Sequence, residues 1–121
     1  MQFENSFYTI QSASNEENEA TFTIKLNAEH PIFAGHFPEK PITPGVVQME
    51  IVKELSKKAL DKELTMISMG NCKFLNFLDP NEAPIIDVVL KFNPQEDNSV
   101  KVSAQMKDES GLYLKMSSQY K

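Results

Sequence analysis

The chain has 121 residues, and 40% of them are hydrophobic. It contains no tryptophan and has a formal net charge of −5. This length fits one domain over residues 1–121 and leaves little room for a second. All twelve basic residues are lysine, so the basic excess and the bidentate arginine contacts that recognise nucleic acid are both missing. The composition therefore argues against a nucleic-acid-binding protein.

No stretch approaches the roughly 18–20 consecutive apolar residues that a membrane-spanning helix needs. The N-terminal sequence MQFENSFYTI lacks the basic and apolar regions of a signal peptide. The single cysteine, Cys72, leaves no partner for an intrachain disulfide and no second thiolate for a metal site. We expect a cytoplasmic protein with no membrane span.

The N-terminal third of the sequence predicts a β-hairpin. Two strand-like runs, 6–13 and 20–27, flank the polar segment 14–19. In the second run, Phe22, Ile24 and Leu26 alternate with polar residues, which is the pattern of a half-buried strand. The segment that follows, 28–42, is rich in proline and glycine and is expected to be irregular.

A helix is predicted to begin at Thr43 and Pro44. Threonine is a suitable N-cap, and proline suits the first helical position because its fixed φ is helical and it has no N–H to leave unpaired. The first two turns are apolar nearly all round, which predicts that this half is deeply buried. Lysines and acidic residues follow towards Lys62, so the C-terminal half must reach solvent.

The rest of the sequence predicts strands. They cover 64–78, with Gly70 as a candidate β-bulge, then 84–92, 100–106 and 112–120, with turns at 93–99 and 107–111. One buried helix among antiparallel strands predicts an α+β fold in which a sheet wraps around the helix.

Three residues between Gly35 and Glu50 suggest chemistry. His36 is a natural general base, although spacing alone favours a hydrogen-bonded structural histidine beside Phe37 and Pro38. Glu50 lies in the most apolar part of the helix, where burial would favour its protonated form and suit it as a general acid; the alternative is an exposed stripe shared with Lys53 or Glu54. The Gly45 amide, at the second helical position, has no intrahelical partner and can polarise a carbonyl. Together they suit proton abstraction next to a carbonyl with loss of a leaving group.

The segment HPIFAGHFPEKPITPGVVQME resembles the signature of the FabZ/FabA-type 3-hydroxyacyl-[acyl-carrier-protein] dehydratases. Eleven positions match at fixed spacing, and FLNFLDPNE (74–82) is similar to the strand and turn that follow in that family. The matching residues are Pro31, Phe33, Gly35, His36, Phe37, Pro38, Pro41, Pro44, Gly45, Val46 and Glu50.

The resemblance implies a hot-dog fold, which is a curved antiparallel sheet of five to six strands around one long helix. It also implies a dimer or an oligomer of dimers, with each site at the subunit interface; a heterodimer stays open. His36 would remove the C2 proton of a thioester, the Gly45 amide would bind the carbonyl, and Glu50 would help the 3-hydroxyl leave. Phe37, Pro38 and Val46 would contact the substrate. No metal or other cofactor is implied.

Several residues depart from the family pattern. Glu39 replaces a glycine, Thr43 replaces an apolar residue and has a hydroxyl that could cap the helix, and Leu75 and Asn76 replace a pair of arginines. These changes suggest a divergent branch that serves a specialised acyl or aryl-polyene pathway. A thioesterase and a non-catalytic partner subunit of a dehydratase remain the alternatives.

The implied partner is an acyl carrier protein, which presents the acyl chain on a phosphopantetheine arm. Carrier proteins are acidic, and so is this chain, so recognition needs a local basic patch. The candidates are Lys53, Lys57, Lys58 and Lys62 on the exposed half of the helix, where neighbours four residues apart share a face. A solvated helix end is the simpler interpretation, and Lys115 with Lys121 is the alternative patch.

Overall fold

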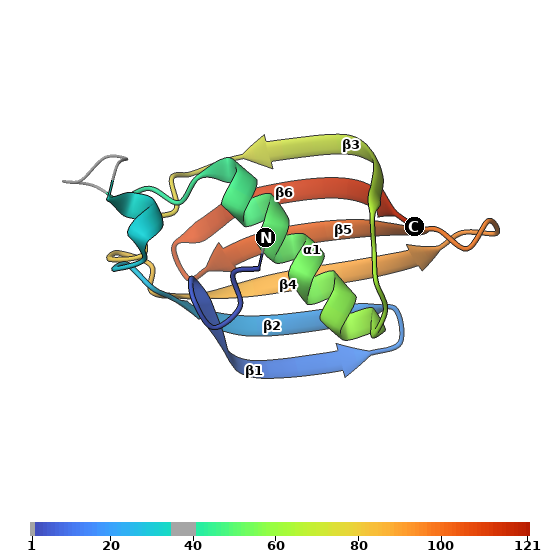
Figure 1. Cartoon of the computed structure of the whole chain (residues 1–121), viewed down its shortest axis with the longest axis horizontal. Coiled ribbons are helices and arrows are strands. Elements are labelled where there is room, and N and C mark those ends of the chain that lie inside the picture. Colours follow the sequence, from blue (N-terminus) through green and yellow to red (C-terminus); the bar gives the residue numbers. More distant parts are fainter. Residues whose placement is uncertain (1, 35–40) are drawn as a thin grey trace.

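The computed structural model describes residues 2–34 and 41–121. Six strands form one antiparallel sheet in the order β1-β2-β4-β5-β6-β3, and the single long helix, α1, crosses one face of it (Figure 1). The elements are β1 (Tyr8–Glu16), β2 (Glu19–Leu26), the short 3₁₀ helix η1 (Pro31–Phe33), α1 (Gly45–Leu60), β3 (Met66–Phe74), β4 (Ile85–Pro94), β5 (Val100–Asp108) and β6 (Gly111–Tyr120). The predicted α+β fold is confirmed.

The predicted hairpin forms, with a longer first strand and a tighter turn than the sequence pattern suggested. β1 and β2 pair from Tyr8 with Leu26 to Glu16 with Glu19, so only Glu17 and Asn18 connect them. Asn18 adopts a φ of 62°, in the left-handed region that asparagine tolerates better than most residues. The polar run 14–19 therefore continues both strands instead of forming a loop.

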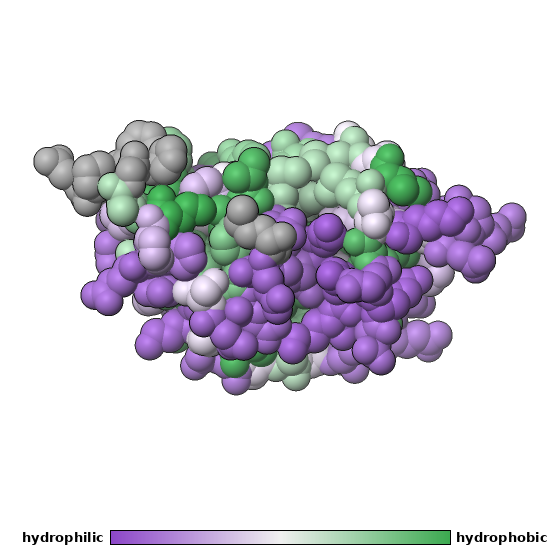
Figure 2. Space-filling model, viewed as in Figure 1, coloured by the Kyte–Doolittle hydropathy of each residue, from purple (hydrophilic) through white to green (hydrophobic). Residues whose placement is uncertain are grey.

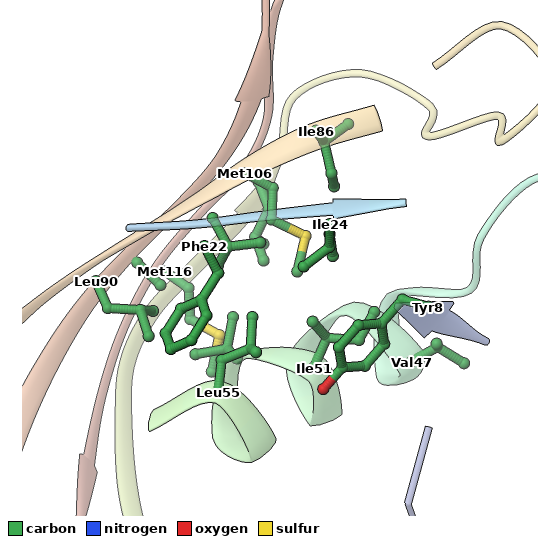
Figure 3. Close-up of a cluster of buried hydrophobic side chains, with 14 of the residues drawn as sticks. Tyr8, Phe22, Ile24, Val47, Ile51, Leu55, Ile86, Leu90, Met106 and Met116 are labelled. Atoms are coloured by element: carbon green, nitrogen blue, oxygen red, sulfur yellow. The ribbon is translucent and has the colours of Figure 1, made fainter. Parts of the chain in front are cut away.

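The core lies between α1 and the sheet (Figure 3). Val47, Ile51 and Leu55 recur every four residues on the buried face of the helix. Facing them are alternate residues of the strands, including Phe22, Ile24, Ile86, Leu90, Met106 and Met116. The strict alternation in β2, β4 and β5 thus places one side of each strand in the core and leaves the other to solvent.

The start of α1 differs from the prediction by one residue. Pro44 is the N-cap, in an extended conformation with ψ of 146°, and Gly45 is the first helical residue. Thr43 does not cap the helix, because its N–H donates to the Leu78 carbonyl at 2.8 Å and its side chain is turned inward, 2% exposed. The hydroxyl cap suggested by the sequence is therefore wrong.

The expected deep burial of the first two turns is also wrong. Only one face of the helix is buried, whereas Val46 is 74% exposed and Met49 and Glu50 are half-buried. The sheet of a single chain covers one side of a helix and leaves the other open. Packing in the core of this chain therefore does not account for the apolar residues on the exposed side of α1.

Glu54 ties the N-terminal segment to α1. Its carboxylate accepts the backbone N–H of Phe3 at 2.7 Å, the N–H of Glu4 at 3.0 Å and the hydroxyl of Tyr8 at 3.0 Å. These charge-assisted hydrogen bonds fix residues that precede β1 against the exposed side of the helix. Burial and the nearby Glu54 carboxylate raise the pKa of Tyr8.

β3 is an edge strand with little burial on either side. All its residues are exposed or half-buried, and Ile67 and Met69 are 49% and 37% exposed. The register with β6 shifts between Met69 and Asn71, which confirms the bulge predicted at Gly70. Hydrophobic surface gathers along this edge, at the top of the view in Figure 2, whereas the surface below it is mostly hydrophilic. In the described part of the chain, no helix is long and apolar enough to cross a membrane.

Candidate functional site

The described candidate residues cluster around the N-terminus of α1. Gly45, Val46 and Glu50 lie on its first two turns, next to η1 and to the connection from β3 to β4. His36, Phe37 and Pro38, the other predicted site residues, lie outside the described residues. The other histidine, His30, is structural: its Nδ1 accepts the N–H of Ile32 at 3.0 Å, and its ring packs edge-on against Phe3 and Phe7.

The N–H groups of Gly45 and Val46 have no acceptor among the described residues. The first N–H groups of the helix that are bonded are those of Val47 and Gln48, which both donate to the Pro44 carbonyl. Free amides at a helix N-terminus carry the positive end of the helix dipole. This part of the site is thus able to accept a carbonyl oxygen and to stabilise negative charge on it.

Phe74 lies directly against Gly45. A Cβ at position 45 would meet the Phe74 ring at 2.6 Å, which is closer than real contacts allow. With the ring in this position, only a glycine fits at position 45. Because Phe74 is 50% exposed, its ring is packed on one side only.

An apolar pocket of about 510 Å³ opens beside the first turn of α1. We call it the N-terminal pocket. Most of its wall is hydrophobic, and two buried polar side chains, Thr43 and Gln48, also line it. Its lining consists of Ile32, Ile42, Thr43, Pro44, Gly45, Val46, Gln48, Phe74, Asn76, Phe77 and Leu78.

Glu50 lines a second hollow of about 400 Å³ on the exposed side of the helix. Val46 lies one turn before Glu50 on the same face, and Lys53 lies three residues after it. Ile32 and Val46 line both hollows, so the two adjoin across the first turn. A molecule that spans this turn can therefore reach the free amides and the Glu50 carboxyl together.

The four helix lysines predicted to dock a carrier do not form an uninterrupted basic patch. Lys57 pairs with Glu63 at 2.7 Å, which raises the pKa of Lys57 and lowers that of Glu63, and Lys58 pairs with Glu4 at 3.2 Å. The surrounding groove holds five carboxylates and three lysines, namely Glu4, Glu50, Glu54, Asp61, Glu63, Lys57, Lys58 and Lys62. Lys53 lies apart from it, beside Glu50.

Of the pocket wall, the sequence motifs assigned only Gly45 and Val46 to the site. Phe74 and Phe77 belong to a segment that was matched to the family, but the pattern there predicts a continuous strand to residue 78. The strand ends at Phe74, and Leu75 then donates to the Tyr113 carbonyl at 3.0 Å. A signal was present, since two phenylalanines close to an expected turn are unusual on an exposed surface. Among the described residues, no three His, Cys, Asp or Glu side chains are placed to hold a metal ion.

Comparison with known proteins gives consistent matches to dehydratases. A family model described as ApeI-like, ApeI dehydratase, matches residues 12–115. The 3-hydroxyacyl-[acyl-carrier-protein] dehydratase FabZ of Rickettsia canadensis is 31% identical over 104 residues, covering 78% of this chain and 71% of that protein. FabZ of Rickettsia typhi is 31% identical over 100 residues, covering 75% and 68%.

Solved structures share the whole architecture. The dehydratase heterocomplex ApeI:P from Xenorhabdus doucetiae contains a chain with a TM-score of 0.68 and 21% identity, covering 93% of this chain and 96% of that one. A mutant thioesterase from Staphylococcus aureus has a TM-score of 0.66 at 8% identity, covering 98% and 94%. The expected hot-dog fold is therefore confirmed.

Proposed function

Because the chain belongs to the ApeI-like dehydratase family, as a divergent relative of the FabZ/FabA-type enzymes, we propose that it dehydrates a 3-hydroxyacyl thioester. The acyl group would be carried by an acyl carrier protein, and the products would be the trans-2-enoyl thioester and water. One structural observation carries the proposal. The free amides of Gly45 and Val46 and the Glu50 carboxyl lie on adjoining hollows of one helix end.

The proposed reaction is a β-elimination. The thioester carbonyl accepts the Gly45 N–H, which stabilises the enolate that forms when the C2 proton leaves. His36 takes that proton; this role rests on the sequence motif, since His36 lies outside the described residues. The C2–H electron pair becomes the C2–C3 double bond, the C3–O bond breaks, and Glu50 donates the proton that turns the hydroxyl into water.

A second subunit is part of the proposal. β3 has one unpaired edge in the described chain, and exposed apolar residues continue from it towards α1: Ile67, Met69, Phe74, Leu75, Phe77 and Val46. A row of unpaired backbone groups beside apolar side chains is suited to pairing with another strand. We propose that a second copy of the chain pairs along β3 and brings its His36 towards Glu50. A different subunit along β3 is the alternative, since the similar solved structure is a dehydratase heterocomplex.

The test is the identity of the product. The purified protein is incubated with 3-hydroxyacyl carrier proteins of several chain lengths, and the intact carrier is weighed by mass spectrometry. A loss of one water from the carrier-bound acyl group supports dehydration. Release of the whole acyl group would instead identify a thioesterase, which the structural neighbour makes the second candidate. No change with any substrate would favour a non-catalytic subunit.

A further inference from the structure

Glu54 lies one turn after Glu50 on α1 and binds the chain around the start of β1. One oxygen of its carboxylate accepts the backbone N–H of Phe3 at 2.7 Å. The other accepts the backbone N–H of Glu4 and the hydroxyl of Tyr8, both at 3.0 Å. Hydrogen bonds to a carboxylate are among the stronger ones in proteins. A single helix side chain thus fixes three groups that lie outside α1.

Phe3, one of the residues held in this way, forms part of the wall beside Glu50. Its side chain is 5% exposed and packs edge-on against Phe7 and His30, with ring centroids 6.1 Å apart in both pairs. Phe3 and Glu50 line the same hollow of about 400 Å³, which we call the Glu50 hollow. The residues before and after Phe3 line the groove of the helix lysines, which Glu50 also borders. Residues 2–4 therefore contribute to the walls of both spaces next to Glu50.

A wall at this place matters for the proposed proton transfer. The Glu50 carboxyl must meet the hydroxyl that leaves C3 while the thioester carbonyl is held at Gly45, so its position has to be defined. An apolar wall keeps bulk water from the proton donor, and water would otherwise compete with the substrate hydroxyl for its proton. The Phe3 ring is suited to this task because it is apolar and is itself fixed by packing on two other rings.

We propose that Glu54 is a positioning residue of the dehydration site: it holds residues 2–4 against α1 so that Phe3 closes one wall of the Glu50 hollow. The inference rests on the proposed function in that Glu50 is the proton donor. Glu54 contacts neither the substrate nor the reacting atoms and acts through Phe3. A glutamine at position 54 would be a poor substitute. It has one acceptor oxygen and an NH₂ group that only donates, whereas both oxygens of Glu54 accept.

The accessibility of the Glu50 carboxyl tests the inference without any catalysis. The intact protein is treated with a water-soluble carbodiimide and an amine, and mass spectrometry measures the labelling of each carboxyl. Glu63 is the internal reference, because its side chain is 86% exposed. We expect the labelling of Glu50 relative to Glu63 to rise several-fold in Glu54→Ala and in Phe3→Ala, and to rise less in Glu54→Gln.

Asp97→Ala is the matched control. Asp97 also accepts a backbone N–H and a hydroxyl, both from Ser99, but it lies in the turn between β4 and β5, at the far end of the sheet from the start of α1 (Figure 1). Its removal should leave the labelling of Glu50 unchanged.

Turnover separates a positioning role from a purely structural one. The substrate is a short 3-hydroxyacyl pantetheine thioester, assayed well below the melting temperature of every variant. Glu54→Ala and Phe3→Ala should each lower kcat roughly tenfold, because the proton donor is less well placed. The double variant should lose no more than Phe3→Ala alone, since Glu54 acts through Phe3. Glu54→Gln should retain an intermediate kcat, and Asp97→Ala should retain the parent kcat.

Unchanged labelling of Glu50 in both Glu54→Ala and Phe3→Ala would overturn the inference whatever the activity. Losses of kcat that multiply in the double variant would overturn it as well. If Glu54→Ala does not fold, Glu54→Gln with Phe3→Ala gives the same comparison with smaller expected effects. Faster labelling of Glu50 in variants of a protein that dehydrates no 3-hydroxyacyl substrate would refute the proposed function and still support the role of Glu54 in closing the hollow.

Discussion

At the scale of single residues, Gly45 serves two needs at one position. Its N–H has no acceptor among the residues that the structure describes, and its missing side chain leaves room for the Phe74 ring. The ring in turn forms part of the wall of the N-terminal pocket. The contact between Gly45 and the Phe74 ring thus links the packing at the start of α1 to the shape of the pocket wall, and an added methyl group would disturb it.

We predict that Gly45→Ala displaces the half-exposed Phe74 ring and lowers stability by about 1 kcal/mol, the low end of the cost of an extra methyl group, because the new Cβ meets only the far end of a side chain. Dehydration should fall as well, because the displaced ring disturbs the first turn. Adding Phe74→Ala should restore much of the stability, since it removes the atoms that the new Cβ meets. Thermal unfolding of the two single variants and the double variant measures this coupling. Additive losses would show that the Gly45–Phe74 contact is not the cause.

Sequence motifs predicted some residues of the candidate site, and the others became apparent only from how the folded chain packs. Gly45 and Glu50 were found from helix-terminus chemistry and from a carboxylate in an apolar run, and both line hollows at the helix end. The role of Thr43 was predicted wrongly, because a threonine before Pro-Gly looks like a cap until the bond to Leu78 is known. Gln48 gave no signal, because its burial beside the pocket exists only in the folded chain.

At the scale of elements, the alternation of apolar and polar residues predicted the strands that have one buried face. β2, β4, β5 and β6 follow their predicted ranges within about two residues, the usual uncertainty of strand ends. β3 was predicted too long, because its residues alternate little and neither side is buried. The sequence pattern cannot distinguish an edge strand, which has one unpaired side, from a strand that is paired on both sides within a sheet.

We predict that Ile67→Glu/Met69→Glu converts the proposed dimer to a monomer. Four like charges would meet across a two-fold interface along β3, and apolar contact area would be lost. Light scattering after size-exclusion chromatography measures the mass, and circular dichroism confirms the fold. The matched control is Ser12→Glu/Ser14→Glu on β1, the opposite edge of the sheet, which should leave the mass unchanged. A parent protein that is already monomeric would refute the shared site.

The lysines of α1 allow a separate prediction about carrier docking. Lys58→Gln/Lys62→Gln removes two charges from the groove at the C-terminal end of α1 and should raise KM for carrier-bound substrate several-fold, with a weaker dependence on salt. Turnover of a short pantetheine thioester should stay near the parent value. Neutralising Lys101 and Lys107, on the outer face of the sheet, makes the same charge change away from the helix. If both pairs change KM equally, or if the short substrate suffers too, the helix is not the docking surface.

At the scale of the whole molecule, all three tyrosines are buried in the fold. Burial raises the pKa of each of them, and for Tyr113, whose hydroxyl donates to Asp108 at 2.7 Å, it reaches about 12. The folded chain therefore holds phenolic protons that the unfolded chain releases near pH 10, the ordinary tyrosine value. This contribution to stability is fully present below about pH 10 and is lost as the pH rises towards 12.

We predict that the tyrosinate absorbance of the native protein rises at a higher pH than that of the unfolded chain, with the raised pKa of Tyr113 near 12. In guanidinium chloride the same chain should titrate near the ordinary value of about 10. Tyr113→Phe should remove part of the delayed titration and reduce the loss of stability above pH 10. A folded protein in which a tyrosine ionises at its ordinary pKa would contradict the burial described for these side chains.

The account as a whole depends on the end of α1 being a dehydration site. The most direct measurement is the rate at which Glu50→Gln converts a 3-hydroxyacyl carrier protein that the parent accepts, with Glu63→Gln as the control. Glu50 lines the hollow beside the free amides, whereas Glu63 pairs with Lys57 at the far end of the helix. The account predicts that Glu50→Gln is slower by roughly two to four orders of magnitude, as for a lost general acid, while Glu63→Gln stays near the parent rate. A folded, correctly assembled Glu50→Gln protein with the parent rate would contradict it.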